Sequence, residues 1–402
     1  MEDFDALMVL PVALADAAAG AALARFRTRT LGVAQEYAAA NGYVGRKGRR
    51  PALFAAGVSM VDGHPVESAF ESWAKDYVGL FAALAVYEAA SAAADPNFVR
   101  DEAWPLLQAV AEFVVARGEW TARGFEFGLS MNRDESMPRV TDASTLSLFG
   151  MRALEVALEC HSTLPDGWRD EQAAKNWAAV LAAIYVPTDS DGVILPFEGA
   201  VHNNDTSPHN WSIGNLQQLL AHGVPARLSA ATVRATLQAE EDLRRKWTAA
   251  HAADPKGNPA TICQGEYMSC PPMAQATALL GDRDTTRTLL RKLAINQTLP
   301  PFDIVSEYPC SECGAGHGVY MTNVGSFLST LYALAGVQAK MGKVGAAWIV
   351  RNATLPSGWD SLSFGRVELG GDTAFRLDVA HGAHATLTPV PEKRCCGHGY
   401  CD

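Results

Sequence analysis

The sequence is poor in positive charge, since 33 lysines and arginines face 44 acidic residues and leave a net charge of −11. A nucleic-acid-binding surface needs basic residues against the phosphates, so this balance excludes nucleic acid as the expected partner. No apolar run reaches the roughly 18 residues of a membrane-spanning helix, and we expect no contact with a membrane. The acidic start, Met1 to Asp5, has neither the basic nor the apolar region of a signal peptide.

The cysteines lack the spacing of a zinc site. Eight are present, but only Cys310 and Cys313 form a C-x-x-C pair, and a four-ligand zinc site usually needs a second pair. We therefore expect no metal ion. Disulfides, or unpaired thiols in the tail that holds Cys395, Cys396 and Cys401, are the alternatives that the sequence leaves open.

Glycosylation signals bear on the compartment. Four N-x-S/T sequons occur, at Asn204, Asn210, Asn296 and Asn352. They favour a secreted glycoprotein in the extracellular space or the lumen of the secretory pathway. The alternative is that these asparagines are ordinary loop residues.

Helical periodicity dominates from about residue 8 to 340. Apolar residues recur there at three- and four-residue spacing, which predicts helices. The predicted helices cover residues 12–40, 71–93, 102–117, 144–160, 171–185, 213–220, 229–251, 272–280, 284–295 and 323–335. Their succession in pairs indicates an (α/α) barrel. A helical-repeat solenoid is the alternative, although no fixed repeat of roughly 30 to 45 residues is found.

Long loops separate these helices, at 43–66, 121–143, 187–211 and 300–322. Loops of this length in a compact domain usually carry function. Two of them present a carboxylate among apolar and aromatic residues, Glu135 and Glu307. Such a pair suits acid/base cleavage of a glycosidic bond, in which one carboxyl group protonates the leaving oxygen and the other activates water. The alternatives are a salt-paired surface carboxylate for Glu135 and a loop hydrogen bond for Glu307.

The period changes to two after residue 345. Apolar residues alternate over 362–369 and 375–379, and Gly370-Gly371-Asp372 between them predicts a hairpin turn. So short a β unit must pack on the helices. We therefore expect a catalytic barrel over 1–340, a small β-sandwich-like domain over 345–390 and a disordered Cys-rich tail over 391–402.

Motifs in the same order as these elements resemble glycoside hydrolase family 65, over about residues 4–388. The matching segments are Trp104 to Val114, Arg133 to Asp142, Ile184 to Asp189, Pro196 to Gly199, Pro301 to Glu307 and Leu355 to Phe364. The family includes acid trehalases, glucosyl-galactosyl-hydroxylysine glucosidases and disaccharide phosphorylases. The resemblance implies an (α/α)6 barrel with a small C-terminal β appendage and no organic cofactor.

The resemblance also implies roles for individual residues. Glu135 stands at the general acid of the family and Glu307 at the general base of its hydrolases, acting on a small carbohydrate such as trehalose or another glucosyl disaccharide. Acidic candidates for substrate binding are Asp5, Glu71, Asp134, Asp142 and Glu198. Aromatic candidates are Trp73, Trp211 and Tyr308. Asp5 as a helix cap and the aromatic residues as core are the structural alternatives. A homodimer is among the candidate assemblies.

Departures from the family pattern keep two other functions open. The segment Leu53 to Ser59 lacks the Trp and Glu expected there, and Ser136-Met137 replaces a Tyr-His pair. A non-catalytic carbohydrate-binding homologue fits these losses. A phosphorylase is the other alternative, but Tyr320 stands where the phosphate-binding His of family phosphorylases is expected. This substitution favours hydrolysis.

Overall fold

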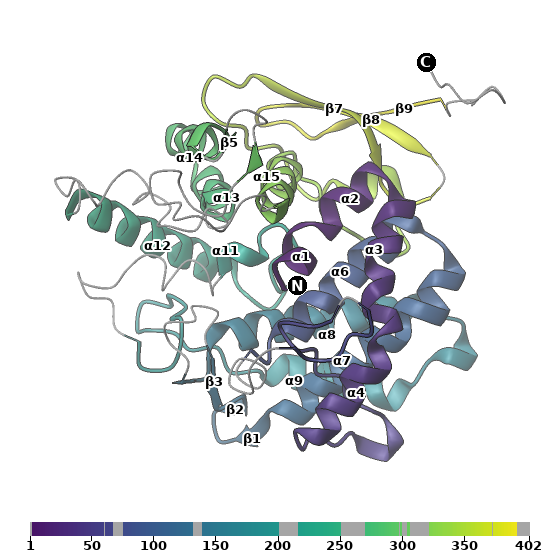
Figure 1. The fold of residues 1–402 in the computed structure, drawn as a ribbon. Coiled ribbons are helices and arrows are strands. Elements are labelled where there is room, and N and C mark those ends of the chain that lie inside the picture. Colours follow the sequence, from purple (N-terminus) through teal and green to yellow (C-terminus); the bar gives the residue numbers. More distant parts are fainter. Residues whose placement is uncertain are drawn as a thin grey trace.

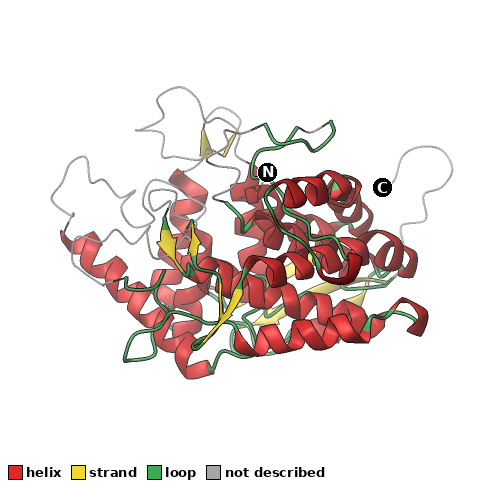
Figure 2. Cartoon of the chain, turned by 90° about the horizontal axis from the view of Figure 1, so that it is seen from below, coloured by secondary structure: helices red, strands yellow, loops and turns green. Residues whose placement is uncertain are grey.

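The computed structural model describes residues 2–59, 61–66, 75–131, 139–200, 216–250, 270–296, 298–299, 304–305, 321–371 and 373–391. The protein is mainly helical, with small antiparallel sheets, as Figures 1 and 2 show. This confirms the predicted fold class, a helical barrel with a small C-terminal β appendage.

Helices that contact one another in sequence order form a closed ring. Its members are α1 (Glu2–Leu7) with α2 (Val9–Ala15), α6 (Val78–Ala93), α8 (Ser144–Thr163), α11 (Leu216–Leu219), α13 (Cys270–Leu280) and α15 (Met321–Leu334). Each helix contacts the next, and α15 returns to α1 and α2. The ring therefore closes between the two ends of the helical region, which are more than 300 residues apart.

Further helices pack against the members of this ring or against one another. They are α3 (Ala17–Arg29), α4 (Leu31–Ala40), α7 (Trp104–Arg117), α9 (Glu171–Ala183), α12 (Ala230–Ala250) and α14 (Arg283–Asn296). Short helical turns are η1 (Arg46–Gly48), η2 (Phe98–Ala103), η3 (Asp166–Trp168) and η6 (Gly345–Trp348). Helix α7 contacts both α6 and α8, and α12 contacts both α11 and α13. This arrangement of ring and outer helices is that of an (α/α) barrel.

The long helix expected over residues 12–40 is instead three helices. Asp16 interrupts it with an extended backbone, at φ −154° and ψ 102°, and its side chain accepts a hydrogen bond from the Ala19 amide. Asp16 thereby caps α3, a role that Asp fills well because its carboxylate satisfies a free amide of the first turn. Thr30 separates α3 from α4. The expectation of one continuous helix was wrong.

The C-terminal sheet confirms the predicted hairpin and extends it. Strands β7 (Ser361–Glu368), β8 (Ala374–Ala380) and β9 (Thr386–Pro389) are antiparallel in the order β7-β8-β9. Val367 and Leu377 are fully buried in the same apolar core as the helices. The Oε2 atom of Glu368 accepts a hydrogen bond of 2.7 Å from the Ala17 amide, at the start of α3. The sheet is thus attached to the barrel by apolar packing and by a helix cap.

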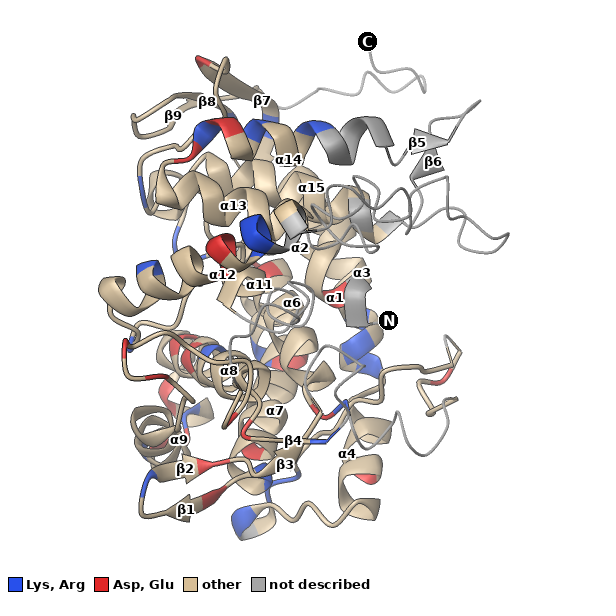
Figure 3. Ribbon diagram, turned by 90° about the vertical axis from the view of Figure 1, so that its left-hand side faces the viewer, with Lys and Arg blue, Asp and Glu red and all other residues tan. Residues whose placement is uncertain are grey.

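Three short antiparallel strand pairs lie in or beside segments that were expected to be loops. They are β1 (Glu119–Thr121) with β2 (Gly124–Glu126), β3 (Leu129–Ser130) with β4 (Val140–Thr141), and β5 (Thr298–Leu299) with β6 (Ile304–Val305). In Figure 3, the pairs β1–β2 and β3–β4 lie at the lower end of the helical body, below α8. The pairs β3–β4 and β5–β6 flank or precede the predicted catalytic loops.

Two further expectations concern the whole chain. Among the described helices, none combines the length and the apolar character that crossing a bilayer requires. The division into 1–340, 345–390 and 391–402 stays a prediction, and residues 392–402 of the tail lie outside the described ranges.

Candidate functional site

Most of the predicted site residues lie outside the described ranges. These are Glu71, Trp73, Asp134, Glu135, Trp211, Glu307 and Tyr308. The described part of the chain nevertheless defines where two of these segments begin and end. The segment with Glu135 connects β3 to β4 in sequence, and Leu129 of β3 pairs with Thr141 of β4. Glu307 follows β6 by two residues, and β6 contacts the ring helix α15.

Asp142 supports the base of the Glu135 loop. Its Oδ1 atom accepts hydrogen bonds from the Phe127 amide, at 3.0 Å, and from the Gly128 amide, at 2.8 Å. The Asp142 amide donates in return to the Gly128 carbonyl, at 2.8 Å. Asp142 adopts φ +50°, a left-handed conformation that few residues other than glycine, asparagine and aspartate tolerate. The side chain is buried by this turn, so in this structure it braces the hairpin.

Glu198 belongs to a polar cluster beside Asp142. The Tyr185 hydroxyl donates to its Oε2 atom at 2.5 Å, and Arg123 lies 3.2 Å from its Oε1 atom. Arg123 also pairs with Glu126 and lies 3.4 Å from Asp142. Burial raises the pKa of Tyr185 to about 12, and the hydrogen bond to Glu198 acts in the same direction. One arginine thus contacts three carboxylates next to the predicted acid loop.

Asp5 is paired within the protein. Its Oδ2 atom accepts hydrogen bonds from Arg27 Nε, at 2.8 Å, and Nη2, at 2.5 Å, and both side chains are almost fully buried. The Arg27 guanidinium also lies 5.3 Å from the centre of the Phe54 ring. Arg27 Nη1 is buried with no hydrogen-bond partner among the described atoms. The pair joins α1 to α3, and its role in sugar binding stays a prediction.

A second, largely buried ion pair, which the sequence did not indicate, joins two predicted site segments. Asp76, two residues after the segment that holds Glu71 and Trp73, accepts a hydrogen bond of 2.5 Å from Arg117 Nε. Arg117 also donates from Nη1 to the Phe127 carbonyl and from Nη2 to the Leu129 carbonyl. Burial raises the pKa of Asp76 above its usual value, against the opposing effect of Arg117. No local spacing could have revealed this pair, because 41 residues separate its members.

Metal-binding groups are not brought together in the described ranges. There, no group of three or more His, Cys, Asp or Glu side chains could hold a metal ion. Cys270 is disulfide-bonded and Cys160 is a buried free thiol. The arrangement therefore offers carboxylates, arginines and a phenol, groups that suit proton transfer and hydrogen bonding to a polar ligand.

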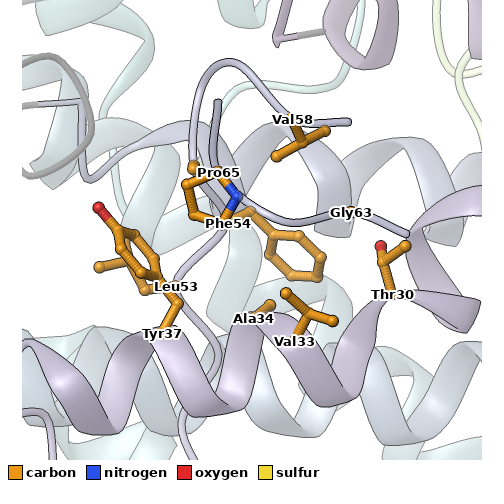
Figure 4. Close-up of a pocket in the computed structure, with 10 residues that line it drawn as sticks. Thr30, Val33, Ala34, Tyr37, Leu53, Phe54, Val58, Gly63 and Pro65 are labelled. Atoms are coloured by element: carbon orange, nitrogen blue, oxygen red, sulfur yellow. The ribbon is translucent and has the colours of Figure 1, made fainter. Parts of the chain in front are cut away.

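A small pocket lies beneath the segment where the family pattern departs. Its walls are almost entirely apolar, as Figure 4 shows: Val33, Ala34 and Tyr37 come from α4, and Leu53, Phe54 and Pro65 come from the segment that follows it. It has room for little more than a water molecule. A sugar needs more space and several polar partners, so this pocket is a packing gap rather than a substrate site.

Comparison with known proteins identifies the family. The model of the glycosyl hydrolase family 65 central catalytic domain matches residues 4–223, more than half of the chain. No curated protein matches significantly. A solved structure titled "Putative kojibiose phosphorylase from human microbiome" has a TM-score of 0.68 and 12% sequence identity, over 98% of this chain and 53% of its own. At this identity the likeness concerns the fold, and the chain spans about half the length of that protein. The matched residues include the β3–β4 pair and Asp142, which supports it. The chain therefore belongs to glycosyl hydrolase family 65.

Proposed function

We propose that the protein hydrolyses the glycosidic bond of an α-linked glucoside, trehalose or another glucosyl disaccharide, with inversion. Glu135 protonates the glycosidic oxygen as general acid. Glu307 removes a proton from the water that attacks the anomeric carbon on the opposite face. Inversion requires the two carboxyl groups to be roughly 6.5–9.5 Å apart, which leaves room for this water.

One structural observation carries the proposal within the family assignment. The loop that contains Glu135 starts and ends at the β3–β4 hairpin, and Asp142 and Arg117 fix the base of that hairpin through backbone amides and carbonyls. A general acid must be held within hydrogen-bonding distance of the oxygen that it protonates. A rigid base is the support that such a residue needs. The polar cluster of Arg123 and Glu198 lies at the same base and offers groups for sugar hydroxyls.

A screen for sugar release tests the proposal. The wild-type chain, Glu135→Gln and Glu307→Gln are incubated with a panel of α-linked glucosyl disaccharides, with and without inorganic phosphate. We expect free glucose from the wild type in the absence of phosphate. Each variant should lose on the order of 100-fold or more in kcat, the usual loss on removing an acid or a base. Full turnover by either variant would contradict its assigned role.

The structural neighbour favours a second candidate, a phosphorylase. In that reaction inorganic phosphate replaces water as the attacking group, and no general base from the protein is needed. The product would be a glucosyl phosphate, formed only when phosphate is added. Glu307→Gln would then retain activity, whereas Glu135→Gln would not.

A non-catalytic carbohydrate-binding protein is the third candidate. Leu53 and Phe54, in the segment where the family carries Trp and Glu, are buried and line the apolar pocket of Figure 4. They present no polar group to a sugar. Sugar binding measured by calorimetry without any turnover, and unchanged in Glu135→Gln, would favour this candidate.

We also propose that the protein resides in the secretory pathway or outside the cell. Asn352, the first residue of one sequon, is exposed, and Cys270 is disulfide-bonded. Disulfides persist mainly in oxidising compartments. Expression through a secretory host should give a mass decrease on deglycosylation, and Asn352→Gln should remove one glycan from it. A protein of unmodified mass would contradict the proposal.

A further inference from the structure

Arg117 connects two segments that are far apart in the sequence. It ends helix α7, and each of its three guanidinium nitrogens donates a hydrogen bond. Nε donates to the carboxylate of Asp76, and the Nη atoms donate to the carbonyls of Phe127 and Leu129, at 2.5 and 2.6 Å. One side chain therefore fixes the approach to the Glu135 loop against the start of α6.

Burial makes this connection rigid. The Asp76 side chain is 2% exposed and that of Arg117 is 11% exposed. A buried carboxylate that loses its cation is left without compensation, which strongly disfavours any separation of the pair. The planar guanidinium holds its three acceptors at fixed angles, which an ammonium group could not do.

Asp142 also holds the backbone within residues 127–129. Arg117 binds the carbonyls of Phe127 and Leu129, whereas Asp142 binds the amides of Phe127 and Gly128. The three residues that precede the acid loop thus have their backbone fixed by side chains from α7 and from the end of the hairpin. Few degrees of freedom remain at the point where the loop begins.

We propose that Arg117, anchored by Asp76, is a positioning residue that sets the placement of the general-acid loop relative to the segment that precedes α6. This inference rests on the proposed function. Each nitrogen of the guanidinium donates to Asp76 or to a backbone carbonyl. Arg117 acts through the backbone of residues 127–129, and so on the delivery of the proton rather than on the attack of water.

Leaving-group dependence distinguishes this role from a purely structural one. A disaccharide needs a proton on its departing oxygen, whereas the fluoride ion leaves α-glucosyl fluoride with little or no help from an acid. A misplaced acid should therefore slow hydrolysis of the disaccharide and leave hydrolysis of the fluoride nearly unchanged. A displacement of about 1 Å can cost roughly 100-fold in rate. General loss of folded protein would slow both substrates equally.

The test measures kcat on a disaccharide substrate and on α-glucosyl fluoride, together with the melting temperature, for Arg117→Lys and Asp76→Asn. The second variant keeps the shape of the side chain at position 76 and serves if the first does not fold. We expect kcat of each variant to fall about 10- to 100-fold on the disaccharide and less than about 3-fold on the fluoride. Glu135→Gln should show the same selectivity, with a larger loss on the disaccharide. Arg49→Lys is the matched control, because Arg49 is also a partly buried arginine between two carboxylates, Glu112 and Asp170.

The outcomes separate the two proposals. Equal losses on both substrates, or an unchanged rate on the disaccharide, would overturn the positioning role while Glu135→Gln still shows a functioning acid. The same selective loss in Arg49→Lys would also overturn it. If the wild type releases no sugar, or if Glu135→Gln keeps full turnover, the proposed function fails and the positioning role fails with it.

Discussion

The Nδ1 atom of His222 lies 2.6 Å from Oε1 of Glu88, and both side chains are 3% exposed. Glu88 belongs to α6, and His222 follows α11 shortly after its end. Arg152 of α8 donates from Nε to the His222 carbonyl, at 2.9 Å. Three consecutive members of the helical ring therefore meet through hydrogen bonds in the interior.

Removal of one partner of this pair should destabilise the barrel. His222→Leu leaves the Glu88 carboxylate buried without a donor, which should cost about 3 kcal/mol of unfolding free energy. Glu88→Gln keeps an acceptor for the imidazole and should cost about 1 kcal/mol. Urea unfolding measures both. The double variant Glu88→Leu/His222→Leu should lose less than the sum of its single changes, and strict additivity would contradict the coupling.

Three substitutions separate the two demands on Asp142, its left-handed backbone and its hydrogen bonds. Asp142→Asn tolerates φ +50° and keeps one acceptor, so it should cost about 1 kcal/mol. Asp142→Gly relieves the backbone but loses both acceptors. Asp142→Ala loses both acceptor oxygens and keeps the strained backbone, so it should cost about 3 kcal/mol of unfolding free energy. We expect the melting temperatures to fall in the order wild type, Asn, Gly, Ala; a glycine variant below the alanine variant would contradict this reading of the turn.

The helices of the barrel could be predicted from the sequence because their apolar period is long and regular. Within the described residues, nine of the expected segments differ from the observed helices mainly at their ends, for example α12 and α14. The segment 12–40 was misjudged because alanine-rich sequence is helical on either side of Asp16, and the capping role of that residue decides the break. Strands of two or three residues, such as β3 and β6, are too short to show any period.

The candidate site was predictable only as a set of segments. Motif resemblance indicated the loops of Glu135 and Glu307, because such motifs are local in sequence. The contacts that support them are not local. Asp76 meets Arg117 across 41 residues and Asp142 meets Phe127 across 15, through a fold that must first close. Spacing rules for helices and strands reach only three or four residues and cannot anticipate such pairs.

Asp282 should make the protein less stable in acid. Burial raises the pKa of its carboxyl group, but hydrogen bonds from the Thr285 amide and hydroxyl and the charge of Arg245 outweigh this, so the pKa lies below its usual value of 3.8. Because the pKa is lowered in the folded state, the ionised carboxylate stabilises the fold at pH values above 3.8. This contribution is lost as the pH falls through the pKa of the folded state. Asp282→Asn keeps the cap but not the charge. The midpoint temperature of thermal unfolding should be lower for the variant than for the wild type at pH 7, and the two should approach each other near pH 2.5. An equal difference at both pH values would contradict the prediction.

Cys160 should be chemically silent in the folded protein. Burial raises the pKa of its thiol to about 12, and the nearby Glu159 charge acts in the same direction. At pH 8 only roughly one molecule in ten thousand would carry the reactive thiolate, and the sulfur is shielded from solvent as well. Iodoacetamide should leave Cys160 unmodified over an hour in native buffer and alkylate it fully in guanidinium, as read by peptide mass spectrometry. Cys160→Ala should lose less stability than Cys160→Ser, because serine would bury a hydroxyl among apolar neighbours. Rapid alkylation of the native protein would show that α8 opens far more often than its packing against α6 and α7 implies.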